Sequence, residues 1–235
     1  MTTPLTTRIR MELLAHGANL VGFGDLSELL PEVRGGLSVG IAVAVKYPKD
    51  TIRGIHHMPT EEYYNQYNIL NEKLDTLVEF GAELLRDNGF TAFPQTRAFV
   101  NQFLTGNSSL LPHKTVATRA GLGWIGKCAL LVTEEYGSMI RLSSILTDAP
   151  LTTSKPINMS RCGDCRVCAD ICPAGAISGN LWKVGIDRDR FFDAALCRKT
   201  ARERTMQSLQ IELTLCGKCI EICPYTVRYL KTDIS

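Results

Sequence analysis

The sequence has no apolar run long enough to cross a bilayer. Its longest apolar stretch, around Gly40 to Val45, is far shorter than the roughly 20 residues of a membrane-spanning helix. The amino-terminal residues also lack the apolar segment behind a basic start that an export signal carries. We therefore expect a cytoplasmic protein with no membrane partner.

Blocks of like charge are also missing. The chain has 26 Lys and Arg residues against 24 Asp and Glu, which gives a formal net charge of +2. The two signs are mixed through most of the chain, a pattern typical of an ordinary solvated surface. No basic face for nucleic acid is evident.

Cysteine, by contrast, is abundant, with nine residues. Four lie in the run Cys162-Gly-Asp-Cys165-Arg-Val-Cys168-Ala-Asp-Ile-Cys172-Pro173. In bacterial ferredoxins, three cysteines at two-residue gaps hold one 4Fe-4S cluster, and the fourth, before a proline, ligates a second cluster. The spacing therefore predicts iron-sulfur clusters. A tetrahedral zinc site is the alternative, but zinc needs neither the third thiolate nor the repeated proline.

A second, shorter run completes the predicted ligand set. It repeats the end of the first run, with Leu213 where the first cysteine would be, and Cys197 supplies the missing ligand. We assign cluster one to Cys162, Cys165, Cys168 and Cys223, and cluster two to Cys172, Cys197, Cys216 and Cys219. Eight cysteines used as metal ligands indicate a reducing compartment. Two oxidised clusters would bring the formal charge to about −2.

Hydrophobic periodicity predicts an α/β domain over residues 1–155, followed by a ferredoxin-like double-cluster domain over 156–235. Helices are expected over residues 5–16 and 61–88, with glycines at their ends, and a third should begin at His113. Strands are expected over residues 21–25, 37–45 and 89–94, with 37–45 buried on both faces. Residues 128–133 and 139–146 are expected to pair as a hairpin.

A glycine-rich segment, Arg119-Ala-Gly121-Leu122-Gly123-Trp124-Ile-Gly126-Lys127, precedes the expected hairpin. Its glycines would let the backbone approach a large flat ligand, with Trp124 as an apolar wall and Lys127 as an anion contact. The segment has neither Rossmann nor Walker spacing. From the spacing alone, a structural turn with a core tryptophan is the simpler interpretation.

Together with Glu135-Tyr-Gly-Ser138 and the two cysteine runs, this segment resembles the epoxyqueuosine reductase family and its relatives, the corrinoid reductive dehalogenases. The resemblance implies a nitroreductase-like cobalamin-binding domain fused to a ferredoxin-like domain with two 4Fe-4S clusters. It also implies an oxidoreductase that passes electrons from a low-potential ferredoxin- or flavodoxin-like donor through the clusters to base-off cobalamin. The implied cofactor-binding residues are Arg119, Gly121, Leu122, Gly123, Trp124, Gly126, Lys127 and Cys128.

The chain departs from the family as a short, divergent member. The family's proton-donating aspartate lies a dozen or so residues before the glycine-rich segment, but here Asn107-Ser-Ser109 occupies that region. No Asp or Glu occurs between Asp87 and Glu134. His113 becomes the candidate general acid, because an imidazole can titrate near neutral pH; a capping role is its alternative.

Other candidate groups are less specific. Tyr63, Tyr64 and Tyr67 are expected in the core, although one could donate a proton, and His56-His57 in a loop. The ninth cysteine, Cys128, is expected to be a small buried strand residue or to approach the cobalt or a substrate. The chain also ends twelve residues after Cys223, without the family's helical-repeat region. We therefore do not expect tRNA as a substrate.

These observations favour a cobalamin-dependent iron-sulfur reductase that acts on a small molecule or a corrinoid. The alternative is an electron-transfer or corrinoid-handling protein that reduces cobalamin without substrate chemistry of its own. A third possibility is a plain two-cluster ferredoxin behind an unrelated amino-terminal domain.

Overall fold

A computed structural model describes residues 4–104 and 109–232. The chain forms two compact units, each assembled from separate stretches. The first, here called the sheet unit, comprises Met1–Val45, Leu70–Gly123 and Arg141–Ile157. The second, called the cysteine unit, comprises Lys46–Ile69, Trp124–Ile140 and Asn158–Ser235. This division differs from the single boundary expected near residue 155.

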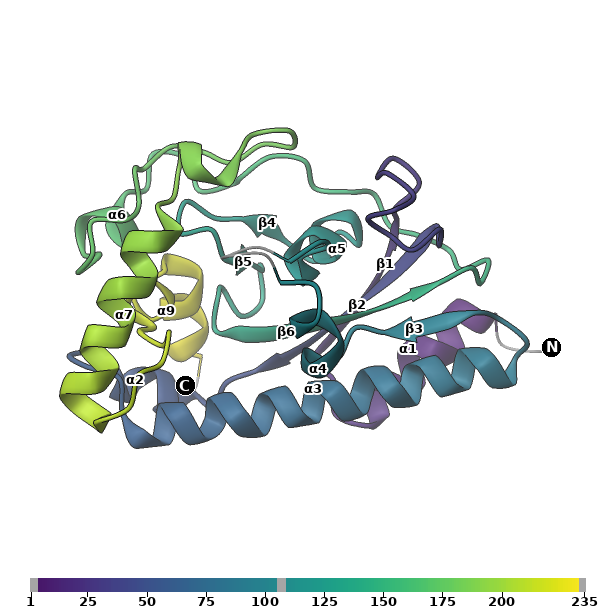
Figure 1. Cartoon of the computed structure of the whole chain (residues 1–235), viewed down its shortest axis with the longest axis horizontal. Coiled ribbons are helices and arrows are strands. Elements are labelled where there is room, and N and C mark those ends of the chain that lie inside the picture. Colours follow the sequence, from purple (N-terminus) through teal and green to yellow (C-terminus); the bar gives the residue numbers. More distant parts are fainter. Residues whose placement is uncertain (1–3, 105–108, 233–235) are drawn as a thin grey trace. The chain divides into compact units, whose positions relative to one another are not determined.

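The sheet unit is built on a four-stranded sheet in the order β1-β2-β6-β3 (Figure 1). Strand β1 (Leu20–Asp25) is antiparallel to β2 (Val39–Lys46), and β3 (Ala92–Pro94) is antiparallel to β6 (Ile140–Thr147). Seven of the eight β2 residues are buried, which confirms the prediction of a strand buried on both faces.

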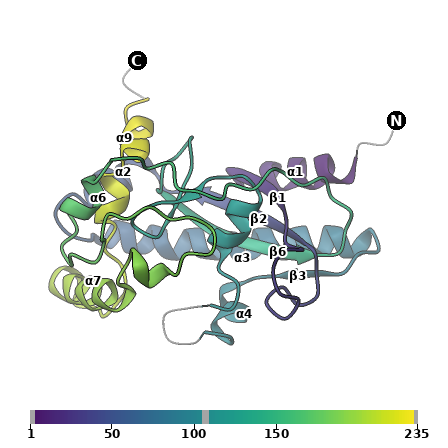
Figure 2. The ribbon, with the colours of Figure 1, turned by 90° about the horizontal axis from the view of Figure 1, so that it is seen from above.

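Helices cover both faces of this sheet. Helices α1 (Leu5–Ala15) and α3 (Glu61–Asp87) run along one side of it, as Figures 1 and 2 show. They meet at Gly81, where a Cβ would come within 2.6 Å of Ile145 and 3.1 Å of Leu13. The short helices α4 (Arg97–Asn101) and α5 (His113–Arg119) complete the unit. Close packing of these apolar side chains forms its core.

Helix α5 approaches the sheet over three glycines. A Cβ at Gly40 would lie 2.6 Å from a Val116 methyl group, and a Cβ at Gly24 would lie 2.7 Å from the Ala120 nitrogen. Gly24 and Gly40 are opposite each other in the β1–β2 ladder, and Gly22 meets Ala120 in the same way. These positions admit no side chain, so the glycines determine where α5 and the segment after it lie.

The cysteine unit contains short helices and a two-stranded sheet. The sheet pairs β4 (Trp124–Ile125) with β5 (Leu131–Val132). The helices are α2 (Lys49–Gly54), α6 (Val167–Asp170), the 3-10 helix η1 (Arg188–Arg190), α7 (Ala194–Leu209), α8 (Lys218–Glu221) and α9 (Pro224–Leu230).

Two close contacts explain why earlier stretches of the chain belong to the cysteine unit. A Cβ at Gly137 would overlap the backbone of Thr226, and a Cβ at Gly217 would overlap the Ile55 side chain. Both glycines have positive φ, +58° and +78°. The stretches around residues 55 and 137 therefore pack directly against the second cysteine run and the helix after it.

Most predicted elements are confirmed to within a few residues, including both long helices and the left-handed Gly89 after α3, with φ +86°. The predicted hairpin is wrong. Residues 126–130 form a turn closed by a bond from the Gly126 nitrogen to the Leu130 oxygen, 2.8 Å, so β5 pairs with β4. Strand β6 pairs with β3 instead.

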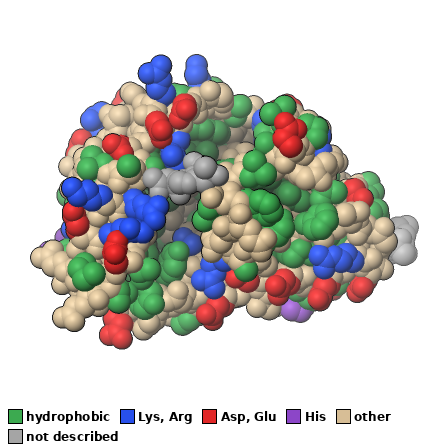
Figure 3. All heavy atoms as spheres, in the orientation of Figure 1, with side chains coloured by type: hydrophobic (Ala, Val, Ile, Leu, Met, Phe, Trp, Pro, Cys, Tyr) green, Lys and Arg blue, Asp and Glu red, His purple; other side chains and the backbone are tan. Residues whose placement is uncertain are grey.

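The surface in Figure 3 carries Lys and Arg interspersed with Asp and Glu, in keeping with the small net charge. Across residues 4–104 and 109–232, no helix is both long and apolar enough to cross a membrane.

Candidate metal centre

Eight half-buried cysteines lie in the cysteine unit. The first run folds around α6, and the second run surrounds α8. Cys223 is the N-cap of α9, with Pro224 at the first helical position. Cys197 is placed in the first turn of α7, whose N-cap Asp193 accepts a hydrogen bond from the Leu196 nitrogen at 2.9 Å. A proline and a capped helix therefore position the two cysteines that complete the predicted ligand sets.

Neighbouring thiols perturb one another in two groups. Burial, together with the Cys162 and Cys168 thiols, raises the pKa of Cys223. Burial and the Cys172 and Cys216 thiols raise the pKa of Cys197 to about 11. Each group contains three of the four cysteines assigned to one cluster, and the full assignment stays a prediction. No three His, Cys, Asp or Glu side chains in the described part of the chain could hold a single metal ion.

A cavity of about 200 Å³ lies among these thiols. The four cysteines assigned to cluster one line it, and so does Cys219, which is assigned to cluster two. A small cavity surrounded by soft sulfur donors fits a compact iron-sulfur cluster. The donor set is therefore compatible with the predicted cofactor.

The β4 strand and the turn after it pack against the first cysteine run. The Trp124 indole Nε1 donates a hydrogen bond to the Cys162 sulfur at 3.4 Å, and its ring meets the Tyr225 ring edge-on at 4.9 Å. The Lys127 ammonium donates to the Cys165 carbonyl oxygen at 2.8 Å. Trp124 is fully buried and Lys127 is 4% exposed. The roles of Trp124 as a ligand wall and Lys127 as an anion contact stay predictions.

Cys128 is buried, as predicted, but it lies in the turn between β4 and β5 and not in a strand. Its thiol shares hydrogen bonds with Cys168 and Cys219. The bond with Cys168 lowers the pKa of Cys128, but the bond with Cys219 and burial outweigh it and raise that pKa. Cys128 therefore touches one cysteine of each predicted ligand set.

Other residues of the glycine-rich segment also make internal contacts. The Arg119 guanidinium is buried and pairs with a Glu28 carboxylate oxygen at 2.6 Å. Gly121 has φ +70°, and a Cβ there would lie 2.9 Å from the Lys155 carbonyl oxygen. The Leu122 side chain packs closely on Gly22, and Gly126 packs closely on the Val132 side chain. The binding of a corrinoid by Arg119, Trp124 and Lys127 stays a prediction.

Comparisons with known proteins identify the cysteine runs. Residues 161–226 match a family described as a 4Fe-4S double cluster binding domain. The epoxyqueuosine reductase of Lactococcus garvieae is 30% identical over 165 residues, or 70% of this chain and 42% of the relative. That of Synechocystis is 26% identical over 216 residues, or 90% of this chain and 69% of the relative.

The chain is similar in sequence to epoxyqueuosine reductases. It spans less than half the length of the Lactococcus relative. The iron-sulfur match favours the cluster prediction over the zinc alternative.

Solved structures of two kinds of protein share the fold of this chain. The reductive dehalogenase NpRdhA in complex with 3-bromo-4-hydroxybenzoic acid has a TM-score of 0.72 and 20% identity, covering 93% of this chain and 31% of that one. An epoxyqueuosine reductase with an epoxyqueuosine-modified tRNA-Tyr stem loop has a TM-score of 0.62 and 20% identity, covering 98% and 68%.

These structures confirm the predicted fold class and cover nearly the whole chain. This coverage argues against a plain ferredoxin behind an unrelated domain. Because one similar structure carries a tRNA stem loop, the expectation against tRNA has no support.

The predicted general acid, His113, is in the sheet unit. His113 is the first residue of α5, half-buried, with Nδ1 2.9 Å from the Ser144 hydroxyl. Burial and the Arg141 guanidinium lower the pKa of His113 to about 4, against the opposing effect of Asp75. This pKa lies below the near-neutral value expected for His113, and a catalytic role for it stays a prediction. Asn107 and Ser108 lie outside the described residues.

The remaining candidates have structural contacts. His56 lies in a loop, as predicted, and its Nδ1 is 2.5 Å from a Glu221 carboxylate oxygen, which Lys218 also contacts at 2.8 Å. Tyr63 is 2% exposed and packs on Tyr47, with ring centroids 5.3 Å apart, as expected of a core residue.

Two residues beside the cysteines were missed from the sequence. Arg161 and Tyr225 both line the thiol cavity. The Arg161 guanidinium lies 5.6 Å from the Trp124 ring centre, and burial, followed by the Glu134 carboxylate, raises the pKa of Tyr225. Their positions directly before Cys162 and after Pro224 were the available signal.

Proposed function

We propose that this chain is an iron-sulfur reductase that uses two 4Fe-4S clusters and base-off cobalamin. The observation that carries the proposal is the grouping of the thiols, with Cys223 near Cys162 and Cys168, and Cys197 near Cys172 and Cys216. The first group would hold cluster one with Cys165, and the second would hold cluster two with Cys219. The likeness to epoxyqueuosine reductases and to a 4Fe-4S double cluster domain supports this assignment.

When bound, the clusters would supply one-electron transfer, and a corrinoid would supply low-potential reductive chemistry. The chain's own residues would set the surroundings of cluster one. The Trp124 N–H points at the Cys162 sulfur and would stabilise negative charge on it. The buried Lys127 ammonium would offset thiolate charge nearby. The bulky Trp124 and Tyr225 rings would limit access of water to this side of the site.

The corrinoid part of the proposal depends on the fold likeness, not on the buried residues of the glycine-rich segment. A similar structure is that of a B12-dependent dehalogenase, with a TM-score of 0.72 and 19% identity. The proposed electron donor is a low-potential ferredoxin- or flavodoxin-like protein in the cytoplasm. The proposed substrate is a small molecule, a free corrinoid or a modified RNA.

A second candidate function is the reduction of cobalamin for another enzyme, without substrate chemistry. The absence of Asp and Glu between Asp87 and Glu134 favours it, as does a His113 that is neutral at pH 7. A reductase that protonates its product needs a donor that titrates near the working pH. Observing cob(II)alamin reduction to cob(I)alamin, with no turnover of small electrophiles or epoxyqueuosine-containing RNA, would favour this candidate.

The deciding experiment is anaerobic reconstitution with iron and sulfide, followed by titration of cob(II)alamin under electron paramagnetic resonance. We expect about eight irons per chain, four for each cluster. Binding should remove the nitrogen hyperfine splitting of the lower ligand, and a low-potential reductant should then remove the cobalt signal. A cobalt spectrum identical to that of free cobalamin would refute the corrinoid part and leave a two-cluster electron carrier.

Matched cysteine variants test the ligand assignment. Cys223→Ser and Cys197→Ser should each remove up to four irons, because each takes a thiolate from a different cluster. Cys128→Ser is the control and should retain about eight irons, because both ligand sets are complete without it. Iron loss in Cys128→Ser, with full iron in Cys197→Ser, would contradict the assignment.

A further inference from the structure

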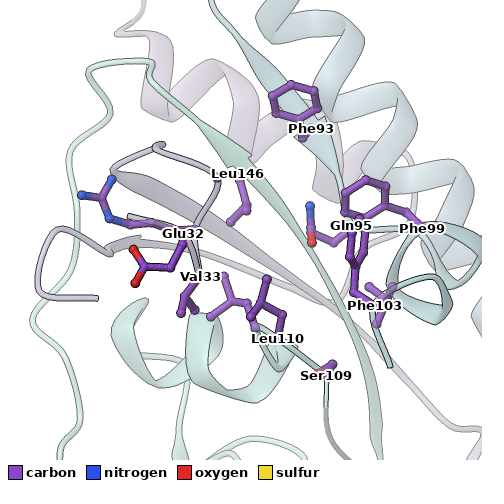
Figure 4. Close-up of a pocket in the computed structure, with 13 residues that line it drawn as sticks. Glu32, Val33, Phe93, Gln95, Phe99, Phe103, Ser109, Leu110 and Leu146 are labelled. Atoms are coloured by element: carbon purple, nitrogen blue, oxygen red, sulfur yellow. The ribbon is translucent and has the colours of Figure 1, made fainter. Parts of the chain in front are cut away.

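A second cavity, of about 340 Å³, lies within the sheet unit (Figure 4). Its walls come from β3, α4, β6 and the segments before β2 and α5. Such a volume is at the lower end of the range for small-molecule sites, which are mostly apolar with a few well-placed polar groups.

Three aromatic rings face this cavity. Phe99 and Phe103 lie on the same side of it, with ring centroids 5.1 Å apart and planes tilted by 54° (Figure 4). Phe93 lines another side, and both Phe93 and Phe103 are about half exposed, at 48% and 49%. Exposed aromatic side chains gathered around one hollow mark a binding site more often than scattered apolar residues do. Flat rings stack well on such walls.

The Gln95 side chain points into this mostly apolar hollow, whose lining also includes Glu32, Arg34 and Ser109. Gln95 is 7% exposed. Figure 4 shows its amide group between Leu146 on one side and Phe99 and Phe103 on the other. Its backbone is fixed, because its nitrogen donates to the Ser144 carbonyl and its carbonyl accepts from the Ser143 hydroxyl, both at 2.9 Å.

The Gln95 side chain lines the cavity, so its amide group is placed to pair with a ligand there. A ligand that pairs with this amide gains a hydrogen bond in mostly apolar surroundings. The amide offers one acceptor and one donor side by side, so its complement carries an N–H next to a C=O.

We propose that this cavity binds a small, uncharged, planar aromatic compound with a lactam-type edge, which pairs with the Gln95 amide while its rings stack on Phe99 and Phe103. The charged residues at the cavity, Glu32 and Arg34, are of opposite sign and balance each other, which suits an uncharged ligand. This proposal is independent of the proposed reductase function, because it concerns only side chains of the sheet unit.

Two bicyclic probes test it on the cluster-bearing protein by calorimetry or ligand-observed NMR. 2-Quinolinone carries the N–H and C=O edge, whereas quinoline has the same rings with only a ring nitrogen. We expect 2-quinolinone to bind about tenfold more tightly, the equivalent of one good hydrogen-bonded pair. Gln95→Leu should remove this preference, and Phe103→Ala should weaken both probes.

Gln102→Leu provides the matched control, since Gln102 is exposed and does not line the cavity. It should leave both affinities unchanged. Circular dichroism confirms that each variant is folded. Equal binding of the two probes to the native protein, or no binding of either at about 1 mM, would overturn the proposal. A preference that persists in Gln95→Leu would overturn it as well.

Discussion

His113 should make the stability of the protein depend on pH between about 4 and 6.5. Burial and Arg141 lower the pKa of His113 to about 4 in the folded protein, against 6.5 for an ordinary histidine. In this window the unfolded chain binds a proton that the folded chain does not. The free energy of unfolding therefore falls as the pH is lowered, and the full contribution is present only above about 6.5.

The size of the effect follows from the two pKa values. At pH 5 the unfolded imidazole is almost fully protonated, while the folded one is mostly neutral. This difference lowers the free energy of unfolding by about 2 kcal/mol relative to pH 8. His113→Gln has no titrating group at this position. Its loss of stability between pH 8 and pH 5 should therefore be about 2 kcal/mol smaller than that of the native protein.

Urea unfolding of both proteins at pH 8 and pH 5, under anaerobic conditions, measures this double difference. Titrating groups common to both proteins cancel in it. Ser144→Ala keeps the imidazole and should retain the native slope, because burial and Arg141, not the bond to Ser144, lower the pKa. A double difference below about 0.5 kcal/mol would show that His113 titrates normally. A role as general acid near neutral pH would then be open again.

Two further predictions concern the cysteine unit. Trp124→Phe removes the N–H that points at the Cys162 sulfur. In a redox titration, it should lower the reduction potential of one cluster by on the order of tens of millivolts. An unchanged potential would contradict this role of Trp124. Gly137→Ala should cost about 3 kcal/mol or more in urea unfolding, because its Cβ would overlap Thr226. Gly185→Ala, at φ +86° with no heavy atom within 4 Å, should cost only about 1 kcal/mol, and equal costs would refute the packing argument.

The sequence was most informative where spacing alone determines the chemistry. The cysteine runs predicted the cluster domain that the family match covers, and periodicity located β2 and α3 within a few residues. Both signals are local, because ligands within one loop and residues on one helical face are close in sequence.

Features that depend on distant contacts could not be predicted. The hairpin prediction failed because Trp124 pairs with Val132, a choice made by the turn over residues 126–130. Nothing in the sequence near His113 reveals that Arg141 lies close enough to depress its pKa. The burial of Trp124 against Cys162 likewise joins segments 38 residues apart. Such contacts are set by tertiary packing, which a periodic pattern does not encode.

The interleaving of the two units determines the order in which they can be completed. The sheet unit has all its residues once Ile157 has been synthesised, whereas the cysteine unit still lacks Asn158–Ser235, which contains all eight predicted ligands. On the ribosome, the sheet can therefore form first. At that stage the stretches Lys46–Ile69 and Trp124–Ile140 still lack Asn158–Ser235, the part of the cysteine unit against which they pack. Iron and sulfide can fill both predicted sites only after Cys223 has been synthesised, when all residues of the sheet unit are already present. A fragment starting at Asn158 would carry the cysteines but not the scaffold that surrounds them.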